Sequence, residues 1–172
     1  LSVFNGFNEF QVNSLTGFDP HLRIESISGN RFENYNEIIG KIKDESDVTG
    51  IAPFTINKGV ISSHKDNAVV YLKGVDDKKI GTVSNVVEET GAGEFEFKDS
   101  EEFGGIVLGL SLAGKLGAKI NDTLTVLSTA GMERALTQIV TPKSVRFIIR
   151  GIYDANNREY DKLYAFISLK YS

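Results

Sequence analysis

Hydrophobic and polar residues alternate along this chain with two periods, one typical of helices and one typical of strands. The clearest helical pattern lies near residue 40, where hydrophobic side chains are spaced three and four positions apart: Tyr35, Ile38, Ile39 and Ile42. This spacing places all four on one face of a helix, and Asn34 precedes them where a side chain can cap the first turn. We therefore predict a helix that begins after Asn34.

Strand-like patterns lie on both sides of this helix. Residues 19–28 alternate between the two faces of a strand, and residues 48–56 form a second apolar segment interrupted by Pro53. A strand, a helix and a second strand in this order have about the length that a crossover connection needs. The pattern therefore predicts an α/β unit over residues 20–57.

Shorter β segments follow this unit. The polar residues 65–67 separate two apolar runs, 59–64 and 68–75, and this arrangement predicts a hairpin. A short helix is predicted over residues 110–116, because Gly117 follows it as a stop signal. Four further strands are predicted at residues 94–97, 106–109, 123–128 and 145–153.

Residues 129–143 form an unusually long connection between two predicted strands, since hairpin loops ordinarily have about two to five residues. The segment carries apolar side chains that a solvated linker would lack: Met132, Leu136, Ile139 and Val140. A flexible methionine on a protruding surface suits a binding site that adapts to its partner. Two interpretations stay open: these side chains bind a partner, or they fold back onto the core or extend the two strands.

Composition narrows the function mainly by exclusion. The chain has 172 residues, near the length of one domain, and its net charge of -4 gives no electrostatic reason to expect nucleic acid. With no cysteine it has no disulfide and no thiolate site, although this says little about its compartment. The longest uncharged apolar run, residues 104–114, is about half of what a membrane-spanning helix needs. Because the chain begins with Leu1, we expect it to be a piece of a longer protein.

Candidate catalytic residues are few. Ser111 lies between a predicted strand and a predicted helix, as the nucleophile of an α/β-hydrolase does, but Ala113 stands where the motif has glycine. Both histidines, His21 and His64, precede the serine, which is the wrong chain order for that enzyme class. They also lack metal-ligand spacing. We predict no catalytic residue, cofactor or metal, and a soluble serine hydrolase stays a distant alternative.

Two segments of the second half carry a resemblance to a known family. Residues 105–128 contain a predicted strand that ends in glycine and leads into a short helix-turn. Residues 142–169 contain Pro142, an Arg-Phe pair and the short motifs "YD" and "YAF". The opening words, residues 5–7 (NGF) and 19–21 (DPH), fit as well. The chain thereby resembles the extracytoplasmic core domain of MacB-like ABC-transporter permeases, most closely the permeases of the lipoprotein-releasing (Lol) system.

The resemblance implies an α+β fold and a membrane setting. It implies a membrane-proximal stem at residues 1–19 and an α/β porter-like part at residues 20–57 and 145–172. A β-rich, sabre-like part with a protruding hairpin at residues 129–143 would be inserted at residues 58–144. The family's porter-like part continues after the "YAF" word with another helix and strands. The domain would lie in the periplasm, attached to the inner membrane and acting with a second permease subunit and a separate cytoplasmic ATPase subunit.

The resemblance also implies a partner. In Lol-type permeases the corresponding hairpin engages a soluble periplasmic lipoprotein-carrier chaperone. It assigns partner binding to six residues: Met132, Leu136, Ile139, Val140, Pro142 and, at the base of the hairpin, Arg146. The hairpin tip departs from the Pro and Gly content of that family. An efflux or mechanotransmission domain of the MacB-like or FtsX-like kind, with an adaptor protein as partner, is therefore the alternative.

Overall fold

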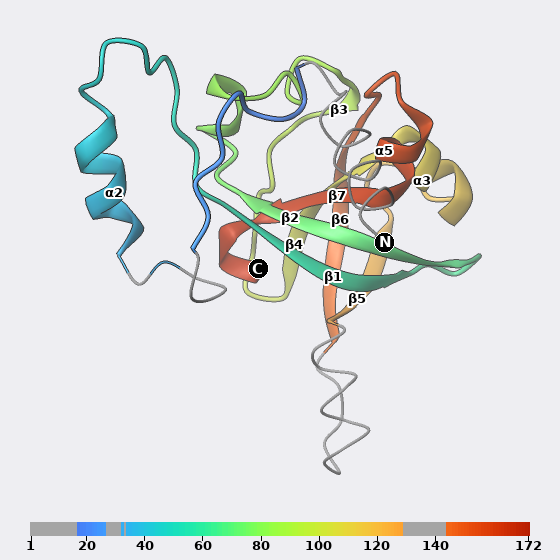
Figure 1. Ribbon diagram of the computed structural model, residues 1–172. Helices are drawn as coiled ribbons and strands as arrows, with labels where there is room; N and C mark the ends of the chain where they lie inside the picture. Colours follow the sequence, from blue (N-terminus) through green and yellow to red (C-terminus); the bar gives the residue numbers. More distant parts are fainter. Residues whose placement is uncertain (1–16, 27–31, 33, 129–143) are drawn as a thin grey trace, which may run out of the picture.

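The structure is a computed structural model that describes residues 17–26, 32, 34–128 and 144–172. Within these residues, helices accompany a single seven-stranded sheet, so the predicted α+β class is confirmed (Figure 1). The strands are β1 (Phe54–Ser62), β2 (Asn67–Val75), β3 (Thr90–Gly93), β4 (Phe103–Gly109), β5 (Thr123–Ser128), β6 (Ser144–Tyr153) and β7 (Tyr164–Ser168). The helices are α2 (Tyr35–Ile42), α3 (Leu110–Leu116) and α5 (Arg158–Leu163), with 3₁₀ turns at Ile80–Thr82 and Leu169–Tyr171.

The long strand β6 closes the sheet into a ring. The strand order is β3-β6-β4-β7-β2-β1-β5, and β5 pairs back onto β6. β4 occupies one edge of β6, whereas β5 and β3 share the other edge, next to residues 144–148 and 151–153 respectively. Closure gives β5 and β6 the partners that the edge strands of an open sheet would lack.

The interior of the ring is filled by alternate residues of the strands. Ile106 and Leu108 of β4 point inward, as do residues of the other five strands of the ring, and most of them are fully buried. The helix α3 contributes Leu112 and Leu116 to the same cluster. Burying a leucine side chain stabilises the fold by about 1.5–3 kcal/mol, so this cluster accounts for much of the stability.

A second apolar cluster covers part of the outside of the ring. Val107 and Phe166 lie one position from inward-facing residues and therefore point outward. The loop between β3 and β4 covers them with Phe95 and Phe97, and α5 adds Tyr160. The ring is thus sandwiched locally between an inner core and an outer aromatic layer.

Most predicted elements are confirmed. The helix α2, the β1–β2 hairpin, the strands β4, β5 and β6, and the helix α3 all lie where the pattern placed them. Gly117 ends α3 with φ +61°, the left-handed conformation that favours glycine. Asn34 stands at the N-cap of α2, but its side chain makes no capping hydrogen bond.

Two predicted strands are wrong within the described residues, and a third is confirmed only in part. Residues 20–26 are not in a strand. Of the strand predicted at residues 48–56, residues 48–53 are not in a strand, whereas residues 54–56 form the start of β1 after Pro53. Residues 94–97 are not a strand either, although Phe95 and Phe97 are both buried as a strand pattern requires. The backbone N–H of Phe97 donates to the Asp77 carboxylate at 3.3 Å instead of to a neighbouring strand. The two-residue period correctly indicated which side chains are buried, but no continuous ladder forms. The Glu94 N–H donates to the Arg150 carbonyl of β6 at 2.9 Å, whereas the Phe97 N–H donates to a side chain.

The proposed division of the chain is not visible as a break in the sheet. β1 runs across the predicted boundary between residues 57 and 58, and β7, from the other porter-like segment, pairs with β2. The division into a porter-like and an inserted part stays a prediction.

Candidate interaction surface

The strand ends that flank residues 129–143 define the candidate surface. Met132, Leu136, Ile139, Val140 and Pro142 lie outside the described residues, whereas Arg146 is described. β5 ends at Ser128 and β6 begins at Ser144, and the pairing of Leu127 with Ser144 holds the two ends side by side. Both strands therefore lead to the same end of the ring (Figure 1).

Arg146 is exposed on the outer face of β6. Its neighbour Phe147 points into the core, so Arg146 points away from it. Arg146 pairs with Phe103 on one side and Thr125 on the other. The guanidinium carbon lies 4.5 Å from the centroid of the Phe103 ring, a cation–π contact that orients the side chain without covering it.

Apolar and hydroxyl side chains occupy the neighbouring positions of the sheet. Val60, Leu127 and Ser144 are paired across three neighbouring strands. Leu127 and Ser144 lie two residues from Thr125 and Arg146, towards residues 129–143 along the chain. A planar guanidinium beside such residues suits carboxylate or carbonyl groups of a partner, because it offers several N–H donors in a fixed fork. The predicted role of Arg146 is chemically reasonable, and it stays a prediction.

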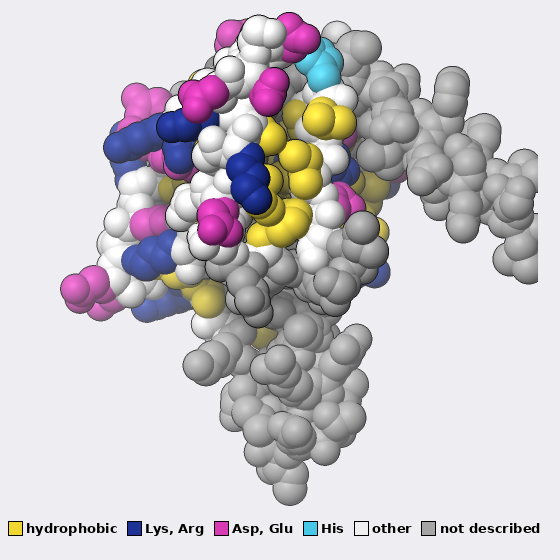
Figure 2. Space-filling model, turned by 60° about the vertical axis from the view of Figure 1, so that its left-hand side comes forward, with side chains coloured by type: hydrophobic (Ala, Val, Ile, Leu, Met, Phe, Trp, Pro, Cys, Tyr) yellow, Lys and Arg dark blue, Asp and Glu magenta, His cyan; other side chains and the backbone are white. Residues whose placement is uncertain are grey.

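Exposed hydrophobic side chains also occur elsewhere. Leu22 is 77% exposed and Leu110 is 52% exposed. Figure 2 shows one face on which hydrophobic side chains gather among lysine, arginine and acidic side chains. Mixed surfaces of this kind are ordinary, so they do not by themselves mark a binding site.

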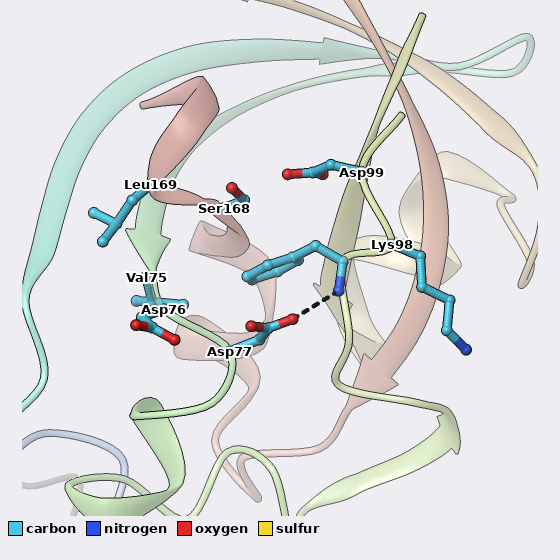
Figure 3. A pocket seen from close by; sticks show the side chains of 8 residues that line it. Val75, Asp76, Asp77, Lys98, Asp99, Ser168 and Leu169 are labelled. Carbon is cyan, nitrogen blue, oxygen red and sulfur yellow. Dashed lines mark hydrogen bonds between the residues drawn. The ribbon is translucent and has the colours of Figure 1, made fainter. Parts of the chain in front are cut away.

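A surface pocket of about 270 Å³ lies elsewhere, between the end of β2, the loop that precedes β4 and the end of β7. Figure 3 shows carboxylates on its walls and the Lys98 side chain extending away from it. Its lining residues are Val75, Asp76, Asp77, Phe97, Lys98, Asp99, Ser168 and Leu169.

The carboxylates of this pocket are occupied by the protein itself. Asp77 accepts from the Phe97 N–H, and Asp99 accepts from the Gly105 N–H at 2.8 Å. Asp76 accepts from the Lys78 N–H at 3.0 Å. Within the described residues, no group of three or more histidine, aspartate or glutamate side chains is arranged to hold a metal ion. These acids therefore serve to fix the loop that covers the outer core.

The described residues do not assemble a hydrolase site. Ser111 lies in the first turn of α3. Among the described residues no hydrogen bond joins it to His21 or His64, both of which are exposed. Ser111 does not have the positive φ of a strained residue, and Gly109 before it is extended with φ -69°. A nucleophile elbow is sharp and strained, so the local backbone offers no support for this alternative.

One carboxyl group near α3 is nevertheless unusual. Asp161 of α5 is 3% exposed, and its Oδ1 accepts from the Ala155 N–H at 2.8 Å. Burial raises the pKa of Asp161 to about 6; the Ala155 hydrogen bond opposes this shift, and the nearby Asp154 adds to it. Within the described residues no hydrogen bond joins the Asp161 carboxyl to Ser111, so we expect the pKa of about 6 to matter for stability.

A buried ion pair attaches the N-terminal residues to the ring. The Lys73 ammonium lies 3.1 Å from Oδ1 of Asp19, with side-chain exposures of 6% and 22%. The pKa of Lys73 is lowered by burial and held up by Asp19. Sequence reasoning missed this pair, because its members are 54 positions apart. The available signal was a lysine within the otherwise apolar run of β2.

Phe18 lies beside this pair and is 6% exposed. Its ring centroid is 5.5 Å from that of Tyr160 and 5.9 Å from that of Tyr153. The Phe18 carbonyl accepts from the Ser84 hydroxyl at 2.8 Å, and the Gly17 carbonyl accepts from the Asn85 N–H at 2.7 Å. Residues 17–19 are therefore held by apolar, ionic and backbone contacts together.

The described helices include none that combines the length and the apolar character needed to cross a bilayer.

Comparison with solved structures defines the class of fold. The chain is similar to the extracellular domain of the noncanonic ABC-type transporter YknZ from Gram-positive bacteria, with a TM-score of 0.52 and 12% identity. The match covers 78% of this chain and 62% of that one, and at this identity it shows a shared fold. The periplasmic region of MacB from Actinobacillus actinomycetemcomitans gives a TM-score of 0.49 with 12% identity, over 81% of this chain and 61% of that chain.

Comparison with sequence relatives gives a more specific similarity than comparison with solved structures. The chain is 27% identical over 158 residues to the lipoprotein-releasing system transmembrane protein LolE of Haemophilus influenzae, covering 87% of this chain and 37% of LolE. It is 26% identical over 161 residues to LolC of Neisseria meningitidis serogroup B, covering 94% of this chain and 38% of LolC. The chain spans less than two fifths of the length of these relatives. No family model matches it.

These similarities confirm the resemblance predicted from the sequence. The chain is similar to the MacB-like periplasmic domain of ABC-transporter permeases and is close to LolC and LolE.

Proposed function

We propose that this chain is the periplasmic domain of an inner-membrane ABC-transporter permease of the lipoprotein-releasing type. The observation that carries the proposal is the similarity to LolE and LolC over most of this chain. Both relatives are named as transmembrane proteins of a release system. The domain would act by binding and movement, and ATP hydrolysis would belong to a separate cytoplasmic ATPase that works with this permease and a second permease subunit.

Within this proposal, residues 129–143 are the contact site for a soluble lipoprotein-carrier chaperone. Their support is chemical: a long connection rich in apolar side chains begins and ends at adjacent strand ends. Arg146 lies exposed at its base and is oriented by Phe103. An apolar segment beside an oriented cation suits a partner that presents an apolar pocket with acidic or carbonyl groups at its rim.

The proposed architecture assigns residues 20–57 and 145–172 to a porter-like part and residues 58–144 to an inserted part. Movement would pass through the domain as a rigid-body shift, since a closed ring with a packed interior deforms little. Whatever residues 129–143 hold would then move with the strands β5 and β6.

The direct test is a calorimetric titration of this chain with a purified lipoprotein-carrier chaperone. We expect Leu136→Asp to weaken binding on the order of tenfold or more, because it places a charge in an apolar contact. The matched control is Leu110→Asp, which changes an exposed leucine on α3. Leu110→Asp should bind like the unaltered chain.

Two results would count against the proposal. If the unaltered chain does not bind the carrier, the lipoprotein-releasing assignment fails, and an efflux or mechanotransmission domain with an adaptor partner becomes the better hypothesis. If both leucine variants bind equally well, the carrier contacts a surface other than residues 129–143.

A further inference from the structure

We propose that residues 17–23, here called the N-terminal anchor, carry mechanical load from the N-terminal residues directly onto β2 and leave residues 24–53 unloaded. The contacts of the anchor do not depend on what the chain does. That a load acts on them in the cell rests on the proposed function. In a permease domain, such an anchor would determine where a pull from the membrane side enters the ring.

The ion pair of the anchor resists separation. The Lys73 ammonium lies between the Phe54 and Phe166 rings, 5.9 and 5.7 Å from their centroids. Pulling Asp19 away would leave a cation in these apolar surroundings without its counter-charge, which is strongly unfavourable. Arg23 continues the contact with its guanidinium carbon 4.9 Å from the centroid of the Phe54 ring.

Backbone and aromatic contacts add to the ion pair. The carbonyls of Gly17 and Phe18 accept hydrogen bonds from Asn85 and Ser84, in the segment that follows β2. Ser84 is 5% exposed, so its hydroxyl has little competing water. The anchor is therefore fixed on both the strand and the loop behind it.

The helix α2, in the segment that follows the anchor, is weakly attached by comparison. α2 has no buried residue, although its hydrophobic spacing gives it an apolar face. Figure 1 shows α2 standing apart from the ring of strands. With the anchor intact, tension reaching residue 17 passes to Lys73 and does not stretch the excursion that contains α2.

From Lys73 the load has a direct path to the candidate surface. β2 pairs with β1 along nine residue pairs, from Phe54–Val75 to Ser62–Asn67, and β1 pairs in turn with β5. That pairing reaches Ser128, the last residue before 129–143. At the other end of the chain, a Cβ placed on Gly74 would collide with Ser172. Both ends of the described chain thus meet β2 at consecutive residues.

The test is single-molecule pulling between residue 1 and the β1–β2 turn. The chain has no cysteine, so cysteines introduced at Leu1 and Lys65 attach the two handles specifically. We expect a first rupture that releases residues 20–53, a gain of about 120 Å at roughly 3.5 Å per residue. Asp19→Ala should shorten the lifetime before this rupture on the order of tenfold at fixed force.

Two controls make the outcome decisive. Glu25→Gln breaks the exposed ion pair with Arg23 beyond the Asp19 contact and should leave the lifetime unchanged. Later unfolding steps of unchanged length show that the Asp19→Ala ring is folded, and Asp19→Asn repeats the test with a side chain of the same shape. Equal lifetimes for Asp19→Ala, Asp19→Asn and the unaltered chain would overturn the proposal, as would residues 20–53 extending without resistance.

A carrier titration separates this inference from the proposed function. Asp19→Ala should bind the carrier like the unaltered chain, because Asp19 contacts Lys73 of β2, whereas residues 129–143 connect the ends of β5 and β6. Failure of the unaltered chain to bind the carrier would refute the proposed function and leave the rupture measurement standing.

Discussion

Two of the described residues, Lys73 and Asp161, have ionisable side chains from which water is largely excluded. Lys73 is neutralised by Asp19, whereas Asp161 has a backbone N–H and a second carboxyl as neighbours. The sequence offered a signal for Lys73, a lysine within an apolar run, but it could not identify Asp19 as the partner or show how deeply Asp161 is buried, because local spacing says nothing about distant contacts. The family resemblance indicated Arg146 as a partner-binding residue, and the structure places it exposed on β6, one position from the buried Phe147.

The Asp161 carboxyl predicts a specific pH dependence. Its pKa in the folded protein is about 6, above its ordinary value of 3.8, so the folded state holds the proton more tightly. The free energy of unfolding contributed by this group is therefore largest below about pH 4 and declines as the pH rises towards 6, on the order of 1 kcal/mol per pH unit.

Asp161→Asn removes this contribution. Asparagine keeps the Oδ1 acceptor for Ala155 and has no proton to lose, so we expect its stability relative to the unaltered chain to rise between pH 4 and pH 6.5. Urea unfolding at several pH values measures the difference, with the exposed Asp47→Asn as a control. A difference that stays constant across this range would contradict the assignment.

At the scale of elements, local patterns succeeded where one face of a helix or strand is consistently apolar. They failed at residues 94–97, where the period was right but the hydrogen-bond partner was the side chain of Asp77. They also failed at residues 20–26, which pack through an anchor rather than through a strand ladder. The period of the hydrophobic residues indicates which face of a segment is buried. Whether the segment forms a strand depends on long-range contacts.

Helix capping gives a prediction at this scale. Oδ1 of Asn157 accepts from the Glu159 and Tyr160 N–H groups at 3.1 and 3.2 Å, whereas Asn34 makes no such bond at the start of α2. We expect Asn157→Ala to lower the free energy of unfolding by about 1 kcal/mol and Asn34→Ala to change it by much less. Chemical unfolding of both variants checks this, and equal losses would contradict the cap assignment.

At the scale of the whole molecule, the feature that the residue pattern did not reveal is closure. The order of strands in the ring depends on pairings such as β6 with β4, which no local spacing encodes. The family resemblance supplied the fold class and setting, and similarity to LolE and LolC agrees with it. In physical terms, the closed ring is a stiff body that connects the N-terminal anchor with the ends of β5 and β6.

The most direct test of the central claim is hydrogen exchange of this chain with and without a purified lipoprotein-carrier chaperone, followed by mass spectrometry. The account predicts slowed exchange in peptides that contain residues 129–143 and the start of β6, with little change in α2. Protection confined to α2 or to the pocket beside Asp77, or no protection anywhere, would contradict it.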